Sequence, residues 1–324
     1  MDTMQKGKPI SSIRRLAAMM VISGLTMLTY GCATISIPQE TEVVHHTSEL
    51  SRAFSIGAIS SCIEQNCRKV SFQDEPQELD PDNISVMNWN IYKGQRDNWM
   101  ADFREFSREQ DIVIIQEAMM HSRLTESLKE QNFNWNLNTG FQYKDVATGV
   151  LTASRVKAVS KQGLRTSEPF LRLPKATLIS RYDLRGSSEQ LLVANIHSVN
   201  FTLGIAAYTK QIRKLQVALE QHDGPIILAG DFNSWSDERL RIIEEMISEL
   251  SLQALSYENH NRTKIFGQEI DHVFYRGLEP VMLETREVTS SDHNPIMVTF
   301  RKPGIDVDMA LQTEAAPAAA LATP

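Results

Sequence analysis

The chain of 324 residues has few cysteines and no excess of basic side chains. Three cysteines are too few to hold a fold together by a disulfide framework. Its 33 Lys and Arg are outnumbered by 40 Asp and Glu, which gives a net charge of -7 at pH 7. Tight binding of duplex nucleic acid comes mainly from neutralised phosphates, so this balance disfavours a broad basic face and leaves only weak or transient binding open.

The remaining composition is that of a globular protein. Hydrophobic residues make up 42% of the chain, which is enough for a full core. The length allows one large α/β domain or two small ones, and we expect one.

The N-terminal end has the pattern of an export signal. Residues 16–31 carry no charge, are too short to span a bilayer and follow four basic residues, Lys6, Lys8, Arg14 and Arg15. Cys32 stands where a bacterial lipoprotein signal is cleaved and its cysteine acylated, although Thr29 occupies a position that is usually aliphatic. We expect 1–31 to be a lipoprotein signal peptide; plain secretion and an uncleaved apolar anchor are the alternatives.

The predicted export affects the expected oxidation state of the other two cysteines. Cys62 and Cys67 lie five positions apart, and an oxidising compartment favours a disulfide between them, with two free thiols as the alternative. No histidine or further cysteine lies at zinc-finger spacing from them.

Composition divides the rest of the chain into three parts. Residues 32–82 are polar and end in the acidic run "QDEPQELDPD", which indicates a tether and a small N-terminal extension. Residues 303–324 end in "AAPAAALATP", which is typical of a disordered tail. We expect the folded catalytic domain between them, at 83–302.

Apolar runs within this domain end in polar residues. "ISVMNWN", "DIVIIQE", "LLVANIH" and "PIILAGDFN" end at or near Asn90, Glu117, His197, Asp231 and Asn233. Helical patterns at 211–220 and 238–250 separate some of these strands, which suits an α/β fold. Because groups just past the strand ends line the crevice of an open α/β sheet, we expect one site built from distant segments.

The residues gathered in this way suit a metal-assisted reaction on phosphate. Carboxylates and amides are hard oxygen ligands that prefer Mg²⁺ or Mn²⁺ to Zn²⁺. Two imidazoles, His197 and His293, add groups that can move protons. Phosphodiester hydrolysis needs an activated water, neutralised phosphate charge and help for the leaving oxygen, and this set can supply all three.

The motifs "MNWNIYKG", "IIQEA", "GVLTASR", "NIHSVNF", "LAGDFN", "IDHVFYRG" and "SDHNP" occur in the order of a known superfamily. Between Asn88 and Phe300 the chain resembles the endonuclease/exonuclease/phosphatase superfamily, and within it the bacterial YafD-like branch. The resemblance implies the deoxyribonuclease I-like fold, an α/β (α+β) architecture in which two mixed sheets form a four-layer α/β/β/α sandwich. It also implies a divalent-metal-dependent phosphoesterase.

The resemblance assigns a role to each matching residue. Metal binding is implied for Glu117, Asn90 and Asp292, and phosphate contact for Asn200. Asp231 matches the residue that orients or deprotonates water, and Asn233 the one that steadies the phosphate. His293 matches the imidazole at the scissile phosphate with Asp271 as its carboxylate partner, and His197 matches a second histidine of deoxyribonuclease-like members. Beside this motif set, Lys93 is a candidate phosphate contact, with a solvated lysine as the alternative.

Two further features refine the expected site. His272 adjoins Asp271, but neighbouring residues of a strand face opposite ways, so we exclude it. Residues 155–181 hold seven Lys and Arg against Glu168 alone, which is either a basic wall for a polyanion or a solvated strand edge.

We therefore expect a hydrolase of phosphoric ester bonds, with a nuclease-like phosphodiesterase preferred because no apolar hairpin suited to a bilayer is visible. A phospholipid or small-metabolite phosphoesterase is the alternative, and a non-catalytic envelope binding module the second. A calcineurin-type phosphatase is excluded because its Gly-Asn-His motif is missing. No protein partner is implied, so we expect a monomer, anchored by lipid on Cys32 to the bacterial envelope, at the outer membrane. A periplasmic or secreted protein is the alternative, or a cytoplasmic one if the N-terminal signal is misread.

Overall fold

The computed structural model describes residues 34–47, 50–55, 78–169, 171–202, 204–258 and 260–303. The expected signal peptide, Cys32, the pair Cys62 and Cys67, and the tail after residue 303 lie outside these ranges.

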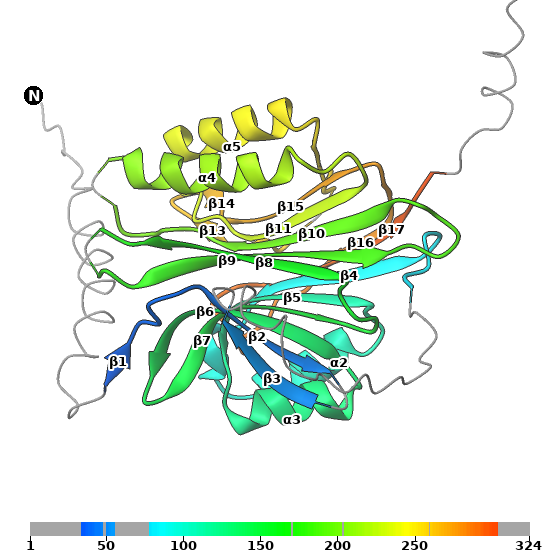
Figure 1. Ribbon diagram of the computed structural model, residues 1–324. Coiled ribbons are helices and arrows are strands. Elements are labelled where there is room, and N and C mark those ends of the chain that lie inside the picture. Colours follow the sequence, from blue (N-terminus) through cyan, green and yellow to red (C-terminus); the bar gives the residue numbers. More distant parts are fainter. Residues whose placement is uncertain are drawn as a thin grey trace, which may run out of the picture.

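Two mixed β-sheets pack face to face (Figure 1). The larger sheet has the strand order β16-β17-β4-β5-β7-β6-β2-β3, with β1 also paired to β6, and the smaller has the order β12-β15-β11-β10-β9-β8. The larger comprises β1 (Ile35–Ser36), β2 (Glu42–Thr47), β3 (Leu50–Ser55), β4 (Ile84–Asn90), β5 (Ile112–Met119), β6 (Asn134–Tyr143), β7 (Val146–Ser154), β16 (Glu279–Thr285) and β17 (Ile296–Arg301). The smaller comprises β8 (Ser160–Ser167), β9 (Pro174–Asp183), β10 (Gln190–His197), β11 (Ile226–Asp231), β12 (Gln253–Ala254) and β15 (Asp271–Arg276), and β13 (Lys264–Ile265) and β14 (Gln268–Glu269) form a separate ribbon.

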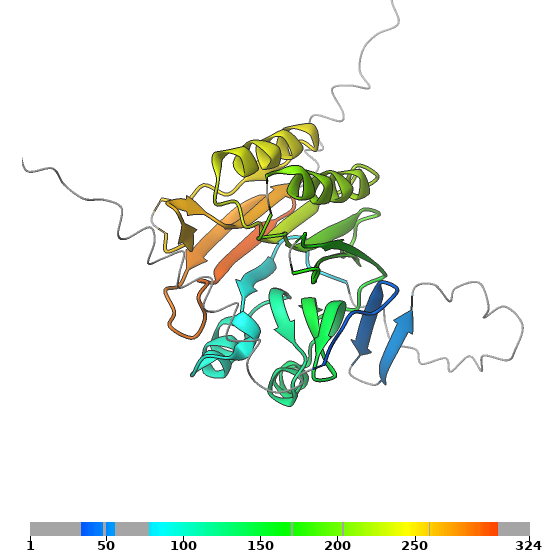
Figure 2. The ribbon, with the colours of Figure 1, turned by 90° about the vertical axis from the view of Figure 1, so that its left-hand side faces the viewer.

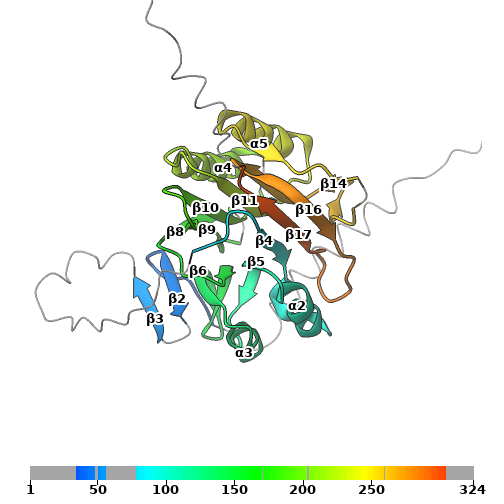
Figure 3. The same ribbon diagram turned by 90° about the vertical axis from the view of Figure 1, so that its right-hand side faces the viewer.

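Helices cover the outer face of each sheet. Figure 3 shows α4 (Ala206–Leu219) and α5 (Asp237–Glu249) over the smaller sheet, and α2 (Trp99–Ser107) and α3 (Ser122–Glu130) over the larger one. A short 3₁₀ turn, η3 (Tyr92–Gly94), follows β4. The layer order is therefore α/β/β/α, and the predicted four-layer sandwich is confirmed.

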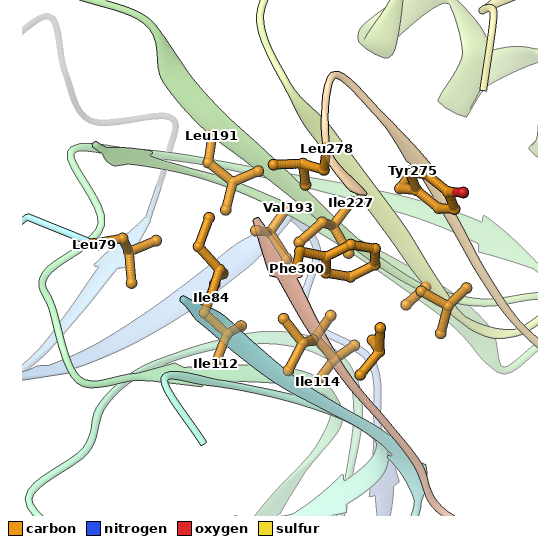
Figure 4. Packing of buried hydrophobic residues seen from close by; sticks show 14 of the residues in the cluster. Leu79, Ile84, Ile112, Ile114, Leu191, Val193, Ile227, Tyr275, Leu278 and Phe300 are labelled. Atoms are coloured by element: carbon orange, nitrogen blue, oxygen red, sulfur yellow. The ribbon is translucent and has the colours of Figure 1, made fainter. Parts of the chain in front are cut away.

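Three apolar layers hold the sandwich together. The middle layer lies between the sheets and includes Ile114, Val193, Ile227 and Phe300 (Figure 4). Helices α4 and α5 close a second layer, and α2 and α3 a third. Because β4, β5, β10 and β11 contact apolar layers on both faces, their sequences are nearly continuous apolar runs rather than alternating ones.

The N-terminal extension contributes strands to the larger sheet. Strand β2 pairs antiparallel with β6, and β3 pairs with β2 at the sheet edge, as Figure 2 shows in blue. Val43 of β2 is buried in a small cluster with Val150 and Leu178. Residues before position 83 therefore pack with the domain that follows them.

None of the helices within the described ranges is both long and apolar enough to cross a membrane.

Candidate active site

Three neighbouring strands of the smaller sheet bring the central residues of the site into one row. Strand β10 is parallel to β11, and His197 is the register partner of Asp231. Strand β15 is antiparallel to β11, and Asp271 is the register partner of Asp231 on its other side. Asp231 thus lies beside residues 34 and 40 positions away in the chain because the strands end in register.

Gly230 is what allows β10 and β11 to approach so closely beside this row. Its φ of 153° lies in a region that other residues rarely adopt, and a Cβ at this position would come within 1.9 Å of the Ile196 carbonyl oxygen. A side chain at the glycine of the "GDFN" motif would therefore collide with the neighbouring strand, which explains why glycine stands there.

Asp271 and His293 form a buried pair. The Nδ1 of His293 lies 2.8 Å from Oδ2 of Asp271, and the Trp89 indole donates to the main-chain carbonyl of His293 at 2.8 Å. Burial by itself lowers the pKa of His293, but the carboxylates of Asp271 and Asp231 outweigh it and raise the pKa to about 10. His293 is therefore an imidazolium at neutral pH, with Nε2 directed toward Asp231 at 3.8 Å from Oδ2.

Asp231 is held at the centre of the row. Its Oδ1 accepts the main-chain N–H of Asn233 at 2.9 Å, and its Oδ2 accepts the Asn90 amide at 3.1 Å. Burial raises the pKa of Asp231 to about 6, although the positive charge of His293 opposes the shift. A carboxylate with such a pKa is ionised at neutral pH and can still accept a proton.

Glu117 sits at a bulge in β5, where the register with β7 shifts between Ile115 and Ala118. Its φ of 52° turns the side chain out of the regular strand alternation. Lys93 of η3 forms an ion pair with the Glu117 carboxylate. Burial raises the pKa of Glu117, but nearby positive charges, Lys93 foremost and Lys175 among them, lower it to about 2, so the carboxylate is ionised.

Lys175 is a site residue that the sequence pattern did not single out. It lies near the start of β9, and its Nζ donates to Nε2 of His197 at 2.7 Å. Burial and the adjacent Lys175 charge lower the pKa of His197 well below its ordinary value. His197 is consequently a neutral imidazole whose Nε2 lone pair faces Lys175, with Oδ2 of Asp231 at 3.4 Å.

A buried arginine holds the loops that carry Asn200 and Asn233. The guanidinium of Arg239 donates to the carbonyls of Asn233 (2.7 Å), Asn200 (2.8 Å) and Val199 (3.0 Å), although only 1% of its surface is exposed. The Asn233 amide donates to the Ser198 carbonyl, and Oδ1 of Asn200 accepts the Trp235 indole N–H at 2.9 Å. Arg239 lies on α5, and nothing in its helical pattern distinguishes it as a site residue.

Side-chain amides tie the two sheets together below the site. Gln116 donates to Oδ1 of Asn195 at 2.8 Å and to Oδ1 of Asn88 at 3.0 Å. Asn195 in turn donates to the carbonyls of Ile115 and Leu151 on the opposite sheet. These bonds fix the distance between the sheet that carries Glu117 and the sheet that carries Asp231.

Two sets of residues offer atoms to a cation. Ligand atoms of Asp231, Asp271 and His293 lie within 4.8 Å of one another, but a protonated His293 has no lone pair to give. Glu117 is an ionised hard-oxygen donor, and Oδ1 of Asn90 accepts the Tyr92 N–H at 3.1 Å and has a second lone pair to offer. Glu117 and Asn90 therefore fit Mg²⁺ or Mn²⁺ better than the set of Asp231, Asp271 and His293 does.

Asp292 and His272 lie at the margins of this arrangement. Asp292 is exposed, and its charge is among those that raise the pKa of His293. His272 points to the other face of β15, where its Nε2 is 2.7 Å from the Ser234 hydroxyl and its ring stacks on Phe274. Direct contacts thus connect five of the predicted site residues: Asn90, Asp231, Asp271, His293 and His197. Glu117 and Lys93 lie beside them. Asn200 lies in the loop that Arg239 holds.

A four-layer sandwich with acidic and imidazole groups at its strand ends defines the deoxyribonuclease I-like class of folds. Residues 87–293 match the model of the Endonuclease/Exonuclease/phosphatase family, and the chain belongs to that family. Proteins of this superfamily are phosphoester hydrolases.

Two curated relatives are UPF0294 proteins, a name that states no activity. A UPF0294 protein of Vibrio campbellii is 38% identical over 240 residues, which cover 74% of this chain and 84% of that protein. A UPF0294 protein of Yersinia enterocolitica is 36% identical over 218 residues, with coverage of 67% and 84%.

Solved structures share the fold at low identity. The human Nocturnin catalytic domain with bound sulfate aligns with a TM-score of 0.54 and 16% identity over 70% of this chain and 97% of its own. An endonuclease/exonuclease/phosphatase protein of Beutenbergia cavernae aligns with a TM-score of 0.53 and 19% identity over 69% and 72%. At such identities these likenesses show the fold alone.

Proposed function

We propose that this protein is a divalent-metal-dependent phosphodiesterase that hydrolyses its substrate by metal-assisted attack of water. The observation that carries the proposal is the buried row of groups at the strand ends. Asp231 lies between the imidazoles of His197 (3.4 Å) and His293 (3.8 Å), and Asp271 holds the ring of His293 at 2.8 Å. Such a row places a proton acceptor, Asp231, and a proton donor, Nε2 of His293, 3.8 Å apart.

In the proposed reaction, members of this row carry each proton. Oxygen of the attacking water forms a bond to phosphorus while its proton passes to the Asp231 carboxylate. As the bond from phosphorus to the leaving oxygen breaks, that oxygen receives the proton on Nε2 of His293. Asp271 keeps the proton on Nδ1 and fixes the ring, in the manner of other carboxylate and imidazole pairs.

Glu117 and Asn90 would hold Mg²⁺ or Mn²⁺, with Asp292 near it. A bound divalent cation supplies Lewis-acid stabilisation of the charge on the phosphate oxygens. The cations Lys93 and Lys175 add positive charge beside the same place, and Asn233 and Asn200 offer amide donors to the phosphate.

The basic segment 155–181, one further ground for the nuclease preference, has its cations dispersed over the fold, with Arg155 at the Gln110 carbonyl, Arg165 at Pro38 and Lys175 at His197. Strand β8 is an edge strand, where Arg165 donates to the carbonyls of Pro38 and Gln39. Of the seven basic residues in this segment, only Lys175 lines the pocket at the site. The hypothesis of nucleic acid cleavage is therefore supported by the chemistry of the site more than by a continuous basic track.

The test is a panel of phosphate diesters and monoesters with Mg²⁺ or Mn²⁺, run on the full chain and on Asp231→Asn. The proposal predicts diester hydrolysis that falls by about 10²-fold or more in the variant, because the proton acceptor is lost. Equal activity in both proteins, or ligand binding without turnover as in a binding module, contradicts it.

We also propose that Cys32 is acylated and anchors the protein to the envelope as a monomer. The charge-free stretch 16–31 after four basic residues supports this. Wild-type protein is expected in the membrane fraction of a bacterial host, and Cys32→Ala is expected to accumulate as an unprocessed precursor. Recovery of the soluble full chain with Met1 intact contradicts the anchor.

A further inference from the structure

A cavity of about 230 Å³ opens directly beside the candidate active site. Four side chains of the site, Lys93, Glu117, Lys175 and His197, form part of its lining. The rest is mainly apolar and includes Met119, Phe141, Leu171, Leu173, Ala176 and Phe201. One space therefore joins the catalytic groups to an apolar surface.

Three large apolar side chains of this lining are half exposed to solvent. Ile35 of β1 is 50% exposed, Leu171 in the β8–β9 turn 54%, and Phe201 after β10 46%. They come from segments far apart in sequence, which is why no single apolar hairpin can be read from the chain. Apolar side chains gathered around one opening mark a surface that an apolar ligand or a membrane covers.

The charges of the lining are confined to a few positions. Its cations are Lys93 and Lys175, both beside the catalytic row, with Glu117 and Glu168 as its anions. A nucleic acid strand needs repeated cations along its backbone. This lining instead suits one phosphate at the charged end and an uncharged apolar group beyond it.

We propose that this cavity binds the apolar part of an amphiphilic phosphodiester, with a membrane phospholipid as the substrate class. The inference rests on the proposed phosphodiesterase activity and names its substrate. The phosphate lies at Lys93 and Lys175, and the first carbons of the apolar group enter between Leu171 and Phe201. At about 230 Å³ the cavity is smaller than the ~300–1,000 Å³ of pockets that enclose a whole ligand, so most of the chain stays outside.

The position of Ile35 agrees with a substrate drawn from a bilayer. Ile35 is three residues after Cys32, and three extended residues reach about 10 Å. Lipid attached to Cys32 would therefore hold the opening of the cavity close to the membrane surface. The cavity and the proposed anchor are argued from different residues and favour the same source of substrate.

The first test compares methyl and butyl 4-nitrophenyl phosphate, two diesters that share the same leaving group, on the full chain with Mg²⁺. Each methylene that enters the cavity is worth ~0.8 kcal/mol, or about fourfold in kcat/KM. The butyl to methyl ratio is therefore expected to reach tens of fold. A ratio near one overturns the inference.

Matched variants locate the effect in the cavity. Leu171→Ser and Phe201→Ser are expected to bring the butyl to methyl ratio toward one. Val217→Ser removes an equally exposed apolar side chain (57%) on α4, outside the lining, and should keep the wild-type ratio. A ratio that falls equally in all three variants contradicts a specific cavity.

Binding separates this inference from the proposed activity. Calorimetry with butyl(methyl)phosphinate and dimethylphosphinate, which contain no ester bond to hydrolyse, should show tighter binding of the butyl compound even if no diester is hydrolysed. If the butyl compound binds more tightly but no diester is hydrolysed, the proposed activity is refuted and the cavity assignment stands. If diesters are hydrolysed but the butyl compound binds no more tightly, the cavity assignment is refuted.

A last comparison distinguishes a free amphiphile, a membrane lipid and a nucleic acid. Phosphatidylglycerol vesicles should be hydrolysed faster than single-stranded DNA or RNA at equal phosphate concentration. Cleavage of the butyl diester without vesicle hydrolysis limits the substrate to soluble amphiphiles and overturns the membrane source. Preferred cleavage of the oligonucleotide overturns the lipid class altogether.

Discussion

The Nδ1 of His293 lies 2.8 Å from the carboxylate of Asp271, within a site where both side chains are buried. This contact joins β15 to the loop before β17, so it connects the two packed sheets as well as two functional groups. It determines the protonation state of His293, and the predicted chemistry depends on that state.

His293 is expected to remain protonated in metal-free protein at pH 8. Its pKa is raised to about 10, above the ordinary 6.5, so the positive form persists until the pH approaches 10. Asp271→Asn removes the carboxylate that raises the pKa of His293 most, while the burial that lowers this pKa remains. The His293 ring should therefore be neutral at pH 8 in this variant. Imidazole ¹⁵N chemical shifts across pH 5–10 measure both states, and a wild-type midpoint below pH 7 would show that the pair does not hold the proton.

Divalent cation binding should depend on Glu117. Glu117→Gln keeps the size of the side chain but removes a charged hard-oxygen ligand, so the Kd for Mn²⁺ should rise at least tenfold. Calorimetric titration of Mn²⁺ measures this without reference to turnover. Glu168→Gln is a matched control on the cavity wall and should keep the Kd within about twofold; equal losses in both would show a general charge effect.

Arg239 should stabilise the loops that carry Asn200 and Asn233. Arg239→Met leaves three backbone carbonyls without their buried donors, and we expect a loss of about 3 kcal/mol in the free energy of unfolding. Arg213→Met is the matched control, because Arg213 makes half-exposed ion pairs with Glu245 and Glu249 that are worth about 1 kcal/mol or less. Urea unfolding measures both, and similar losses would contradict the assigned role of Arg239.

The apolar strands that end in polar residues predicted an α/β domain with its site at one sheet edge, and the resemblance to the superfamily supplied the four-layer sandwich. The helical patterns at 211–220 and 238–250 correspond to α4 (Ala206–Leu219) and α5 (Asp237–Glu249), with ends displaced by up to five residues. Helix ends depend on local capping, which periodicity does not report.

The structure adds residues that depend on register and packing. Seven basic residues lie between 155 and 181, and the pairing of Thr177 with Ile196 is what brings Lys175 to His197. Arg239 is one of several charged residues on α5, and only packing buries it. Strand β2, with the sequence EVVHHT, gains its burial by pairing with β6, which a polar, uneven pattern does not reveal.

The most direct test of the account is a double-mutant cycle at Asp271 and His293, with kcat/KM in Mg²⁺ for dibutyl phosphate, whose leaving butoxide must be protonated, as the measurement. His293→Ala should lower kcat/KM by on the order of 10²-fold to 10⁴-fold, because the proton donor is lost. Asp271→Asn should also lose activity in the wild-type background but add little to the loss in His293→Ala, since Asp271 acts through that ring. Independent, multiplicative losses, or full activity in His293→Ala, would contradict the account.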